Sequence, residues 1–194
     1  MSLQTLSPVD TATTAISSPT PSSQRKSTPT ISHLAIAPTR GIFKVFSTSQ
    51  PSFHLEVITQ ALRLASLGTK VLVVQFFQGG INQGIENPRI LGQNLTWIRN
   101  QINRHITPET ELTPVETELV LRLWTFVQSA VSSGSYGLIV LDQLNLAIEL
   151  DLISETEVVE SLSDRPAALD LILTGANMPV SLTEIADQVT HRRN

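Results

Sequence analysis

Short, almost uninterrupted apolar runs that alternate with helical patterns constrain the fold of this chain most. The runs KVLVVQFF (70–77) and YGLIVLD (136–142) carry apolar side chains on both faces, as expected of parallel strands that are covered on both sides. GIFKVF (41–46) and ALDLILTG (168–175) are similar runs, and LTWIR (95–99) is a weaker strand pattern. Such strands need helices on both faces of their sheet.

Helical patterns separate these runs. Apolar residues from Leu55 to Ala65 recur every three or four positions, and a second stripe extends from Thr113 to about Ser133. Thr113 and Glu116 predict a capping box at the start of the second helix. Strands that alternate with helices predict an α/β fold, a three-layer domain with a parallel sheet and right-handed crossovers.

Two later Ser-x-x-Glu patterns predict further capping boxes. Ser154 and Glu157 precede one short helix, and Ser181 and Glu184 precede the last helix. LNLAIEL (144–150) is also predicted to be helical.

The first 38 residues differ in composition from the rest. Fifteen of them are Ser or Thr and five are Pro, without an apolar period, so they cannot bury enough surface to offset the entropy of ordering. We therefore expect residues 1–38 to form a disordered tail and residues 39–194 to form the folded domain. The chain has no cysteine, which excludes a disulfide framework and suits a cytoplasmic protein.

The net charge of −4 is unevenly distributed. Residues 41–106 carry six Lys or Arg and two acids, whereas residues 107–187 carry two Arg and fourteen acids. The acidic part is either a set of solvated helix faces or a surface for a basic partner. We expect no nucleic-acid partner, because no dense basic patch with interleaved aromatics occurs. We also expect no membrane span, since no apolar run approaches ~20 residues.

The turn after the first strand is where such folds bind phosphate, because the next helix presents free N–H groups there. Here the turn reads STSQPSFH (47–54), with no glycine and no lysine. Pro51 removes one backbone donor, and Phe53 offers no charge to a phosphate. Asp142 ends an apolar strand, where a P-loop enzyme holds magnesium. The other interpretation of Asp142 is a cap of the following helix.

Four segments carry a resemblance to a known family: ALRLASLGTKVLVVQFFQGG (61–80), YGLIVLDQLNLAIEL (136–150), RPAALDLILTGANMP (165–179) and LTEIADQVT (182–190). They resemble the P-loop type of corrinoid adenosyltransferase, which transfers the adenosyl group of ATP to cob(I)alamin. The resemblance implies a P-loop NTPase-like (RecA-like) domain and a homodimer. It also implies Mg-ATP and cobalamin as ligands if the protein is active.

The family's phosphate loop reads roughly TGNGKGKTT, and its residues are not kept in this chain. Counting back without gaps, its glycines fall on Thr48, Gln50 and Ser52. Its phosphate-binding lysine falls on Phe53, and its magnesium-contacting hydroxyl falls on His54. The altered phosphate-loop positions are Thr48, Ser49, Gln50, Pro51, Ser52, Phe53 and His54.

Two further positions depart from the family. The family's LDE is Leu141-Asp142-Gln143 here, and its TGR is Thr174-Gly175-Ala176, so a carboxylate and a cation are absent. The remaining possible contacts to a ligand or metal are Gln75, Asp142, Asn145, Thr174 and Gly175. We predict no catalytic residue and no dedicated metal site, since no two histidines have metal-ligand spacing.

Three hypotheses follow. The first is a catalytically degenerate, non-enzymatic protein with a binding, regulatory or scaffold role, no cofactor and an unidentified protein partner. The second is an ATP:cob(I)alamin adenosyltransferase or corrinoid binder with an atypical nucleotide site. The third is a regulator that binds another small anion or nucleotide at the altered turn. Retention of the fold without the chemistry of the loop favours the first.

Overall fold

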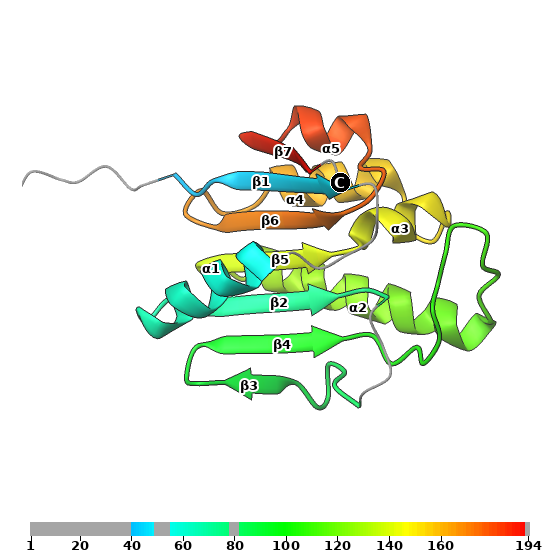
Figure 1. Ribbon diagram of the computed structural model, residues 1–194, viewed down its shortest axis with the longest axis horizontal. Helices are drawn as coiled ribbons and strands as arrows, with labels where there is room; N and C mark the ends of the chain where they lie inside the picture. Colours follow the sequence, from blue (N-terminus) through cyan, green and yellow to red (C-terminus); the bar gives the residue numbers. More distant parts are fainter. Residues whose placement is uncertain (1–39, 49–54, 78–81, 193–194) are drawn as a thin grey trace, which may run out of the picture. The chain divides into compact units, whose positions relative to one another are not determined.

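Seven strands form one sheet in the computed structural model, which describes residues 40–48, 55–77 and 82–192 (Figure 1). From one edge of the sheet to the other, the strands are β3 (Arg89–Leu91), β4 (Leu95–Arg99), β2 (Val71–Gln75), β5 (Leu138–Asp142), β6 (Asp170–Gly175), β1 (Phe43–Thr48) and β7 (Gln188–Arg192). Neighbouring strands are parallel except β3 and β4, which pair antiparallel.

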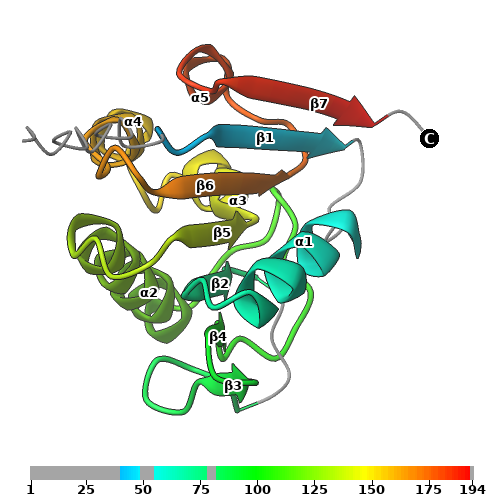
Figure 2. The ribbon, with the colours of Figure 1, turned by 90° about the vertical axis from the view of Figure 1, so that its left-hand side faces the viewer.

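Helices cover both faces of this sheet (Figure 2). The helices are α1 (Leu55–Ser66), α2 (Pro114–Ser132), α3 (Leu144–Glu149), α4 (Glu155–Ser163) and α5 (Val180–Glu184). One face carries α1, and the opposite face carries α2 and α4. The predicted three-layer α/β architecture is therefore confirmed.

The apolar runs become the centre of the sheet. Every residue of β2 and of β5 is buried. Val57 and Ala61 of α1 pack on one face, and Val127 of α2 and Leu162 of α4 belong to the core on the other. Each fully buried Val or Leu contributes about 1.5–3 kcal/mol of hydrophobic stabilisation, which explains why these strands have no polar face.

The amino end of β1 is fixed by Asp187, which lies just before β7. The backbone N–H of Phe43 donates to Oδ2 of Asp187 at 2.8 Å. Arg40 and Arg165 each approach the same carboxylate at 3.6 Å, and Arg165 also lies over the ring of Phe43. These contacts hold the first strand at its entry into the sheet.

Two of the predicted capping boxes are wrong. Ser154 is the N-cap of α4 but makes no side-chain cap hydrogen bond. Glu157, its expected partner, instead accepts hydrogen bonds from Nε1 of Trp124 at 2.8 Å and from Nε2 of Gln128 at 2.9 Å. Two side chains of α2 thus bind the carboxylate that the box would need. Ser181 lies inside α5, and its hydroxyl donates to Glu155.

The chain after α5 is also different from the prediction. The helix ends at Glu184, and residues Gln188–Arg192 form the edge strand β7 beside β1. The short strand β3 was not predicted either. Both lie at edges of the sheet, where pairing with a single neighbour leaves a weak apolar pattern in the sequence.

No helix within the described ranges is both long enough and apolar enough to cross a membrane. All the described residues belong to one compact unit, residues 36–194. The predicted tail, residues 1–38, lies outside the described residues, so its disorder stays a prediction.

The predicted capping box of α2 is confirmed. The backbone N–H of Glu116 donates to Oγ1 of Thr113 at 3.3 Å, and the N–H of Thr113 donates to Oε2 of Glu116 at 2.8 Å. Arg104 donates to both carboxylate oxygens of Glu116 at 2.7 Å. These hydrogen bonds from Arg104 and Thr113 lower the pKa of Glu116 to about 2.

We predict that Thr113→Ala lowers the free energy of unfolding by about 1 kcal/mol, because the backbone N–H of Glu116 loses its acceptor, Oγ1 of Thr113. The matched control is Thr125→Ala, an exposed position inside the same helix, which should change stability by less than about 0.5 kcal/mol. Urea denaturation followed by circular dichroism measures both. Equal effects of the two substitutions would contradict the capping role.

Candidate functional site

The carboxyl ends of four adjacent parallel strands each place one polar residue at the same level of the sheet. The register pairs Arg99 of β4 with Gln75 of β2, Gln75 with Asp142 of β5, and Asp142 with Thr174 of β6. In Figure 1 these positions are the arrow tips on the right. Ligands of parallel α/β sheets bind at this edge, so the row of four residues is the candidate functional site.

Hydrogen bonds connect the buried side chains across the row. Nε1 of Trp97 donates to Oε1 of Gln75 at 2.9 Å, and Nε2 of Gln75 donates to Oδ2 of Asp142 at 3.1 Å. Oγ1 of Thr174 donates to Oδ1 of Asp142 at 2.7 Å. Asp142 is completely buried, and each of its carboxylate oxygens thus accepts a hydrogen bond from within the protein.

Burial changes the acidity of this carboxyl group. Loss of solvation raises the pKa of Asp142 to about 6, whereas the hydrogen bonds from Thr174 and Gln75 and the positive charge of Arg99 act in the opposite direction. Asp142 therefore gains or loses its proton near pH 6, well above the usual range for an aspartate.

Arg99 is the cation of the row. Its guanidinium lies over the ring of Trp97, 5.2 Å from the ring centroid. In the part of the chain that the structure describes, no carboxylate lies within salt-bridge distance of Arg99. The guanidinium thus acts on Asp142 through its charge and not through a direct contact.

A second group of polar residues lies where β5 leads into α3. Gln143 has a left-handed backbone with φ 61°, and its N–H donates to the carbonyl of Thr174 at 2.8 Å. Nδ2 of Asn145 donates to the carbonyl of Ala176. A Cβ added to Gly175 would overlap Oδ1 of Asn145, so this contact requires glycine at position 175.

The structure brings most of the residues proposed from sequence to one edge of the sheet. Gln75, Asp142 and Thr174 form the hydrogen-bonded row, and Asn145 and Gly175 form the adjacent contact. The helix-cap interpretation of Asp142 is wrong, because its oxygens bond to Thr174 and Gln75, and the N-cap of α3 is Gln143.

The altered phosphate turn can be placed only in part. Thr48 is buried at the end of β1, and positions 49–54 lie outside the described residues. The part of the chain that is described holds no group of three His, Asp or Glu able to bind a metal ion.

Arg99, Trp97 and Asn100 were missed by the sequence reasoning. The sequence feature that could have indicated them is the polar end of the strand LTWIR, followed directly by Asn. This end lies at the carboxyl edge of the sheet, where ligands bind.

A model of the family described as ATP:corrinoid adenosyltransferase BtuR/CobO/CobP matches residues 57–194. This chain belongs to that family. The match begins after the altered phosphate-loop positions and contains the whole polar row. The resemblance noted from the four sequence segments is therefore confirmed.

Named relatives agree with the family match. The corrinoid adenosyltransferase of Escherichia coli (strain K12) is 25% identical over 162 residues, which are 79% of this chain and 77% of that protein. The corrinoid adenosyltransferase of Pseudomonas aeruginosa is 25% identical over 161 residues, 78% of this chain and 74% of that protein. An uncharacterized protein of Nostoc sp. is 38% identical over 153 residues, 76% of this chain but only 40% of that longer protein.

We predict that the stability contribution of Asp142 falls as the pH rises. Its pKa is higher in the folded state than the ordinary value of 3.8, so between about pH 4 and 6 the folded state binds more protons than the unfolded state. Wild type should lose stability over this interval relative to Asp142→Asn, by about 1.4 kcal/mol for each unit of pKa difference. Urea denaturation of both proteins at several pH values measures this, and a pH-independent difference would contradict it.

Proposed function

We propose that this chain is a catalytically degenerate member of the corrinoid adenosyltransferase family. It keeps the family fold, does not bind Mg-ATP tightly, and has a non-enzymatic binding, regulatory or scaffold role. The observation that carries the proposal is the state of Asp142, the acid at the position where a P-loop enzyme holds magnesium. It is completely buried, and both of its oxygens are engaged by Thr174 and Gln75.

The residues present do not fit a magnesium–triphosphate site. A cation bound directly to Asp142 would have to displace an internal hydrogen bond, and the burial that raises its pKa also disfavours the charged form that a metal needs. Gln143 supplies an amide where the family has a second carboxylate. Both features weaken cation binding at the end of β5.

The phosphate turn supports the same conclusion from its sequence. Residues 47–54 contain no glycine for close backbone approach and no lysine for the phosphates. Loss of one charge-assisted contact costs roughly 1.5–3 kcal/mol, a factor of about ten to a hundred in affinity. Loss of the backbone cradle adds to this cost.

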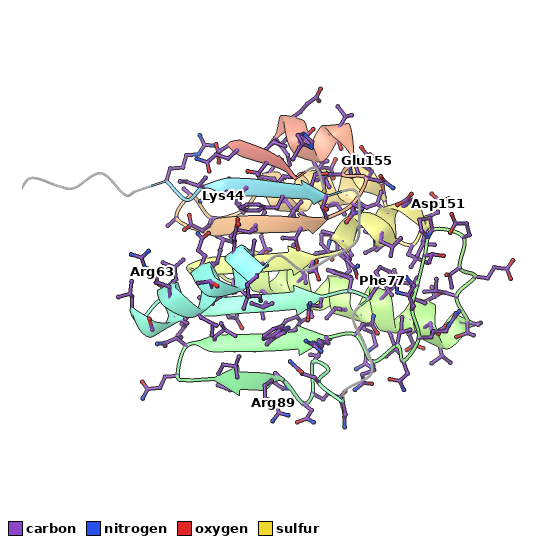
Figure 3. All side chains as sticks on the ribbon, in the orientation of Figure 1. Lys44, Arg63, Phe77, Arg89, Asp151 and Glu155 are labelled. Carbon is purple, nitrogen blue, oxygen red and sulfur yellow. The ribbon has the colours of Figure 1, made fainter. Side chains whose placement is uncertain are left out.

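Lys44 and Arg63 are poorly placed to replace the missing lysine. Figure 3 shows Lys44 and Arg63 toward the amino ends of the strands, away from the carboxyl tips where the turn begins. Lys44 lies near the start of β1, and Arg63 lies in the last turn of α1. Neither residue is near the edge of the sheet where a nucleotide phosphate would be bound.

The corrinoid adenosyltransferase name of the E. coli and Pseudomonas relatives supports the alternative function. In that alternative the chain is an ATP:cob(I)alamin adenosyltransferase or corrinoid binder with an atypical nucleotide site. On the family resemblance we further propose a cytoplasmic homodimer. Sedimentation velocity at micromolar concentration tests the dimer, and a monomer would refute it.

We predict no measurable adenosyl transfer and no tight Mg-ATP binding by this chain. Isothermal titration with Mg-ATP measures binding, and an assay with reduced corrinoid measures transfer. The E. coli relative, run in parallel, is the positive control. A dissociation constant in the low micromolar range, or turnover, would overturn the degenerate assignment and favour the alternative.

A rescue experiment separates the missing lysine from the missing backbone cradle. Phe53→Lys alone should leave Mg-ATP affinity unchanged, because a lone cation cannot replace the N–H groups that a glycine loop directs at phosphate. The combined variant places GNGKGKT at positions 48–54 and should increase affinity by at least tenfold over Phe53→Lys. Equal affinities of the two variants would show that the loop is not the limiting feature.

A further inference from the structure

Two exposed leucines mark the two ends of α1. Leu55, its first residue, is 78% exposed, and Leu67, directly after its last residue, is 72% exposed. The N–H of Leu67 donates to the carbonyl of Arg63 at 3.2 Å, so Leu67 continues the last turn of the helix. Both leucines line the same groove, as does the half-buried Leu64. Apolar side chains gathered along one exposed side of a helix indicate a contact surface.

The groove runs along this side of α1 and has a volume of about 660 Å³. It is lined by Lys44 of β1 and by seven residues of the segment 55–67. The helix itself packs on β2, β4 and β5. Among the described residues, no second helix lies on that face of the sheet beside β1 and β7 (Figure 2). The groove therefore opens over a part of the sheet that no helix of the described chain covers.

The hydroxyl groups on the exposed side of α1 are satisfied by the helix itself. Oγ1 of Thr59 donates to the carbonyl of Leu55 at 2.9 Å, and Oγ of Ser66 donates to the carbonyl of Arg63 at 2.7 Å. A protein surface that covers this side of the helix would therefore leave neither hydroxyl proton without an acceptor. The desolvation cost of covering it is correspondingly low.

The charges at the two ends of α1 have opposite signs. Glu56 lies in the first turn and Arg63 in the last turn, and both line the groove. When two such helices lie antiparallel about a two-fold axis, the acid of each helix comes near the base of the other. The same axis places Leu55 of each helix near Leu67 of the other. This side of α1 is thus complementary to a second copy of itself, and Lys44 adds one further positive charge per chain.

We propose that α1 and the groove beside it form the interface between two copies of this chain, with the two α1 helices antiparallel. The inference rests on the homodimer proposed above and names the surface that forms it. Leu55 of each copy packs against Leu67 of the other, once at each end of the helix pair. One helix and its groove make a small interface, and small interfaces belong to transient complexes, so we expect a dissociation constant in the micromolar range.

Complementary charges at the two leucines test this contact in the full chain. Leu55→Lys and Leu67→Glu should each weaken dimerisation at least tenfold in sedimentation velocity, because each places charges against apolar side chains. The double variant Leu55→Lys/Leu67→Glu should dimerise more tightly than either single variant, since each lysine then faces a glutamate of the other copy. The two positions lie about 18 Å apart along one helix, so this recovery cannot arise within a single chain.

Cysteine cross-linking tests the direction of the helix pair, because the chain has no cysteine of its own. A mixture of Leu55→Cys and Leu67→Cys chains should form disulfide-linked dimers on mild oxidation. Either variant alone should not, since its two thiols would lie at opposite ends of the pair, too far apart for a disulfide. The matched control for sedimentation is Leu121→Glu, an exposed leucine of α2 on the opposite face of the sheet, which should dimerise as wild type does. Thermal melts verify that each variant is folded.

Two results would overturn this interface and leave the homodimer standing. The first is a wild-type dimer that both single leucine variants leave intact. The second is a double variant that dimerises no more tightly than the single variants. A monomeric wild type would refute the homodimer and its interface together. The degenerate assignment is tested separately by the Mg-ATP titration, so its failure is distinguishable from each of these results.

Discussion

The carboxylate of Asp142, buried between Gln75 and Thr174, is the constraint around which the carboxyl edge of the sheet is arranged. Its two hydrogen bonds join β5 to β2 on one side and to β6 on the other. An acid so buried must be satisfied from within or remain protonated. Gln75 and Thr174 meet that requirement, and Nε1 of Trp97 in turn donates to Gln75.

The same arrangement lets the fold be stable without the ligand chemistry of the family. The polar row stabilises the sheet whether or not a nucleotide is bound, because its partners come from the strands themselves. The strand β1 and the helix α1 are present on either side of the turn, although residues 47–54 contain no glycine and no lysine.

Much of the fold could be predicted from sequence because buried parallel strands have a distinct apolar signature. β2 and β5 were found on this basis, and the capping box at Thr113 was found from residue spacing alone. The box predicted at Ser154 is absent because Trp124 donates a hydrogen bond to the glutamate that the box would use. Residue spacing in the sequence does not reveal such tertiary contacts. The edge strand β7 was missed for a related reason, since only β1 stabilises it.

The site was harder to predict than the fold. Asp142 could be proposed because it ends an apolar run, and Gln75 and Thr174 from the family resemblance. Their hydrogen bonds depend on strand order, which the sequence does not state. Asn100 was missed, because a single asparagine after a strand is common and only its burial makes it unusual. Residues whose importance arises from burial require coordinates to be recognised.

The position of β1 has a mechanical consequence. This strand is parallel to β6 on one side and to β7 on the other, and Asp187 holds its amino end through Phe43. Consider a force that pulls on the amino end of β1 along the axis of the strand. Both ladders would then bear it in shear, with all their hydrogen bonds loaded together and none released singly. Two parallel ladders therefore resist tension on the amino end of β1 better than one ladder would.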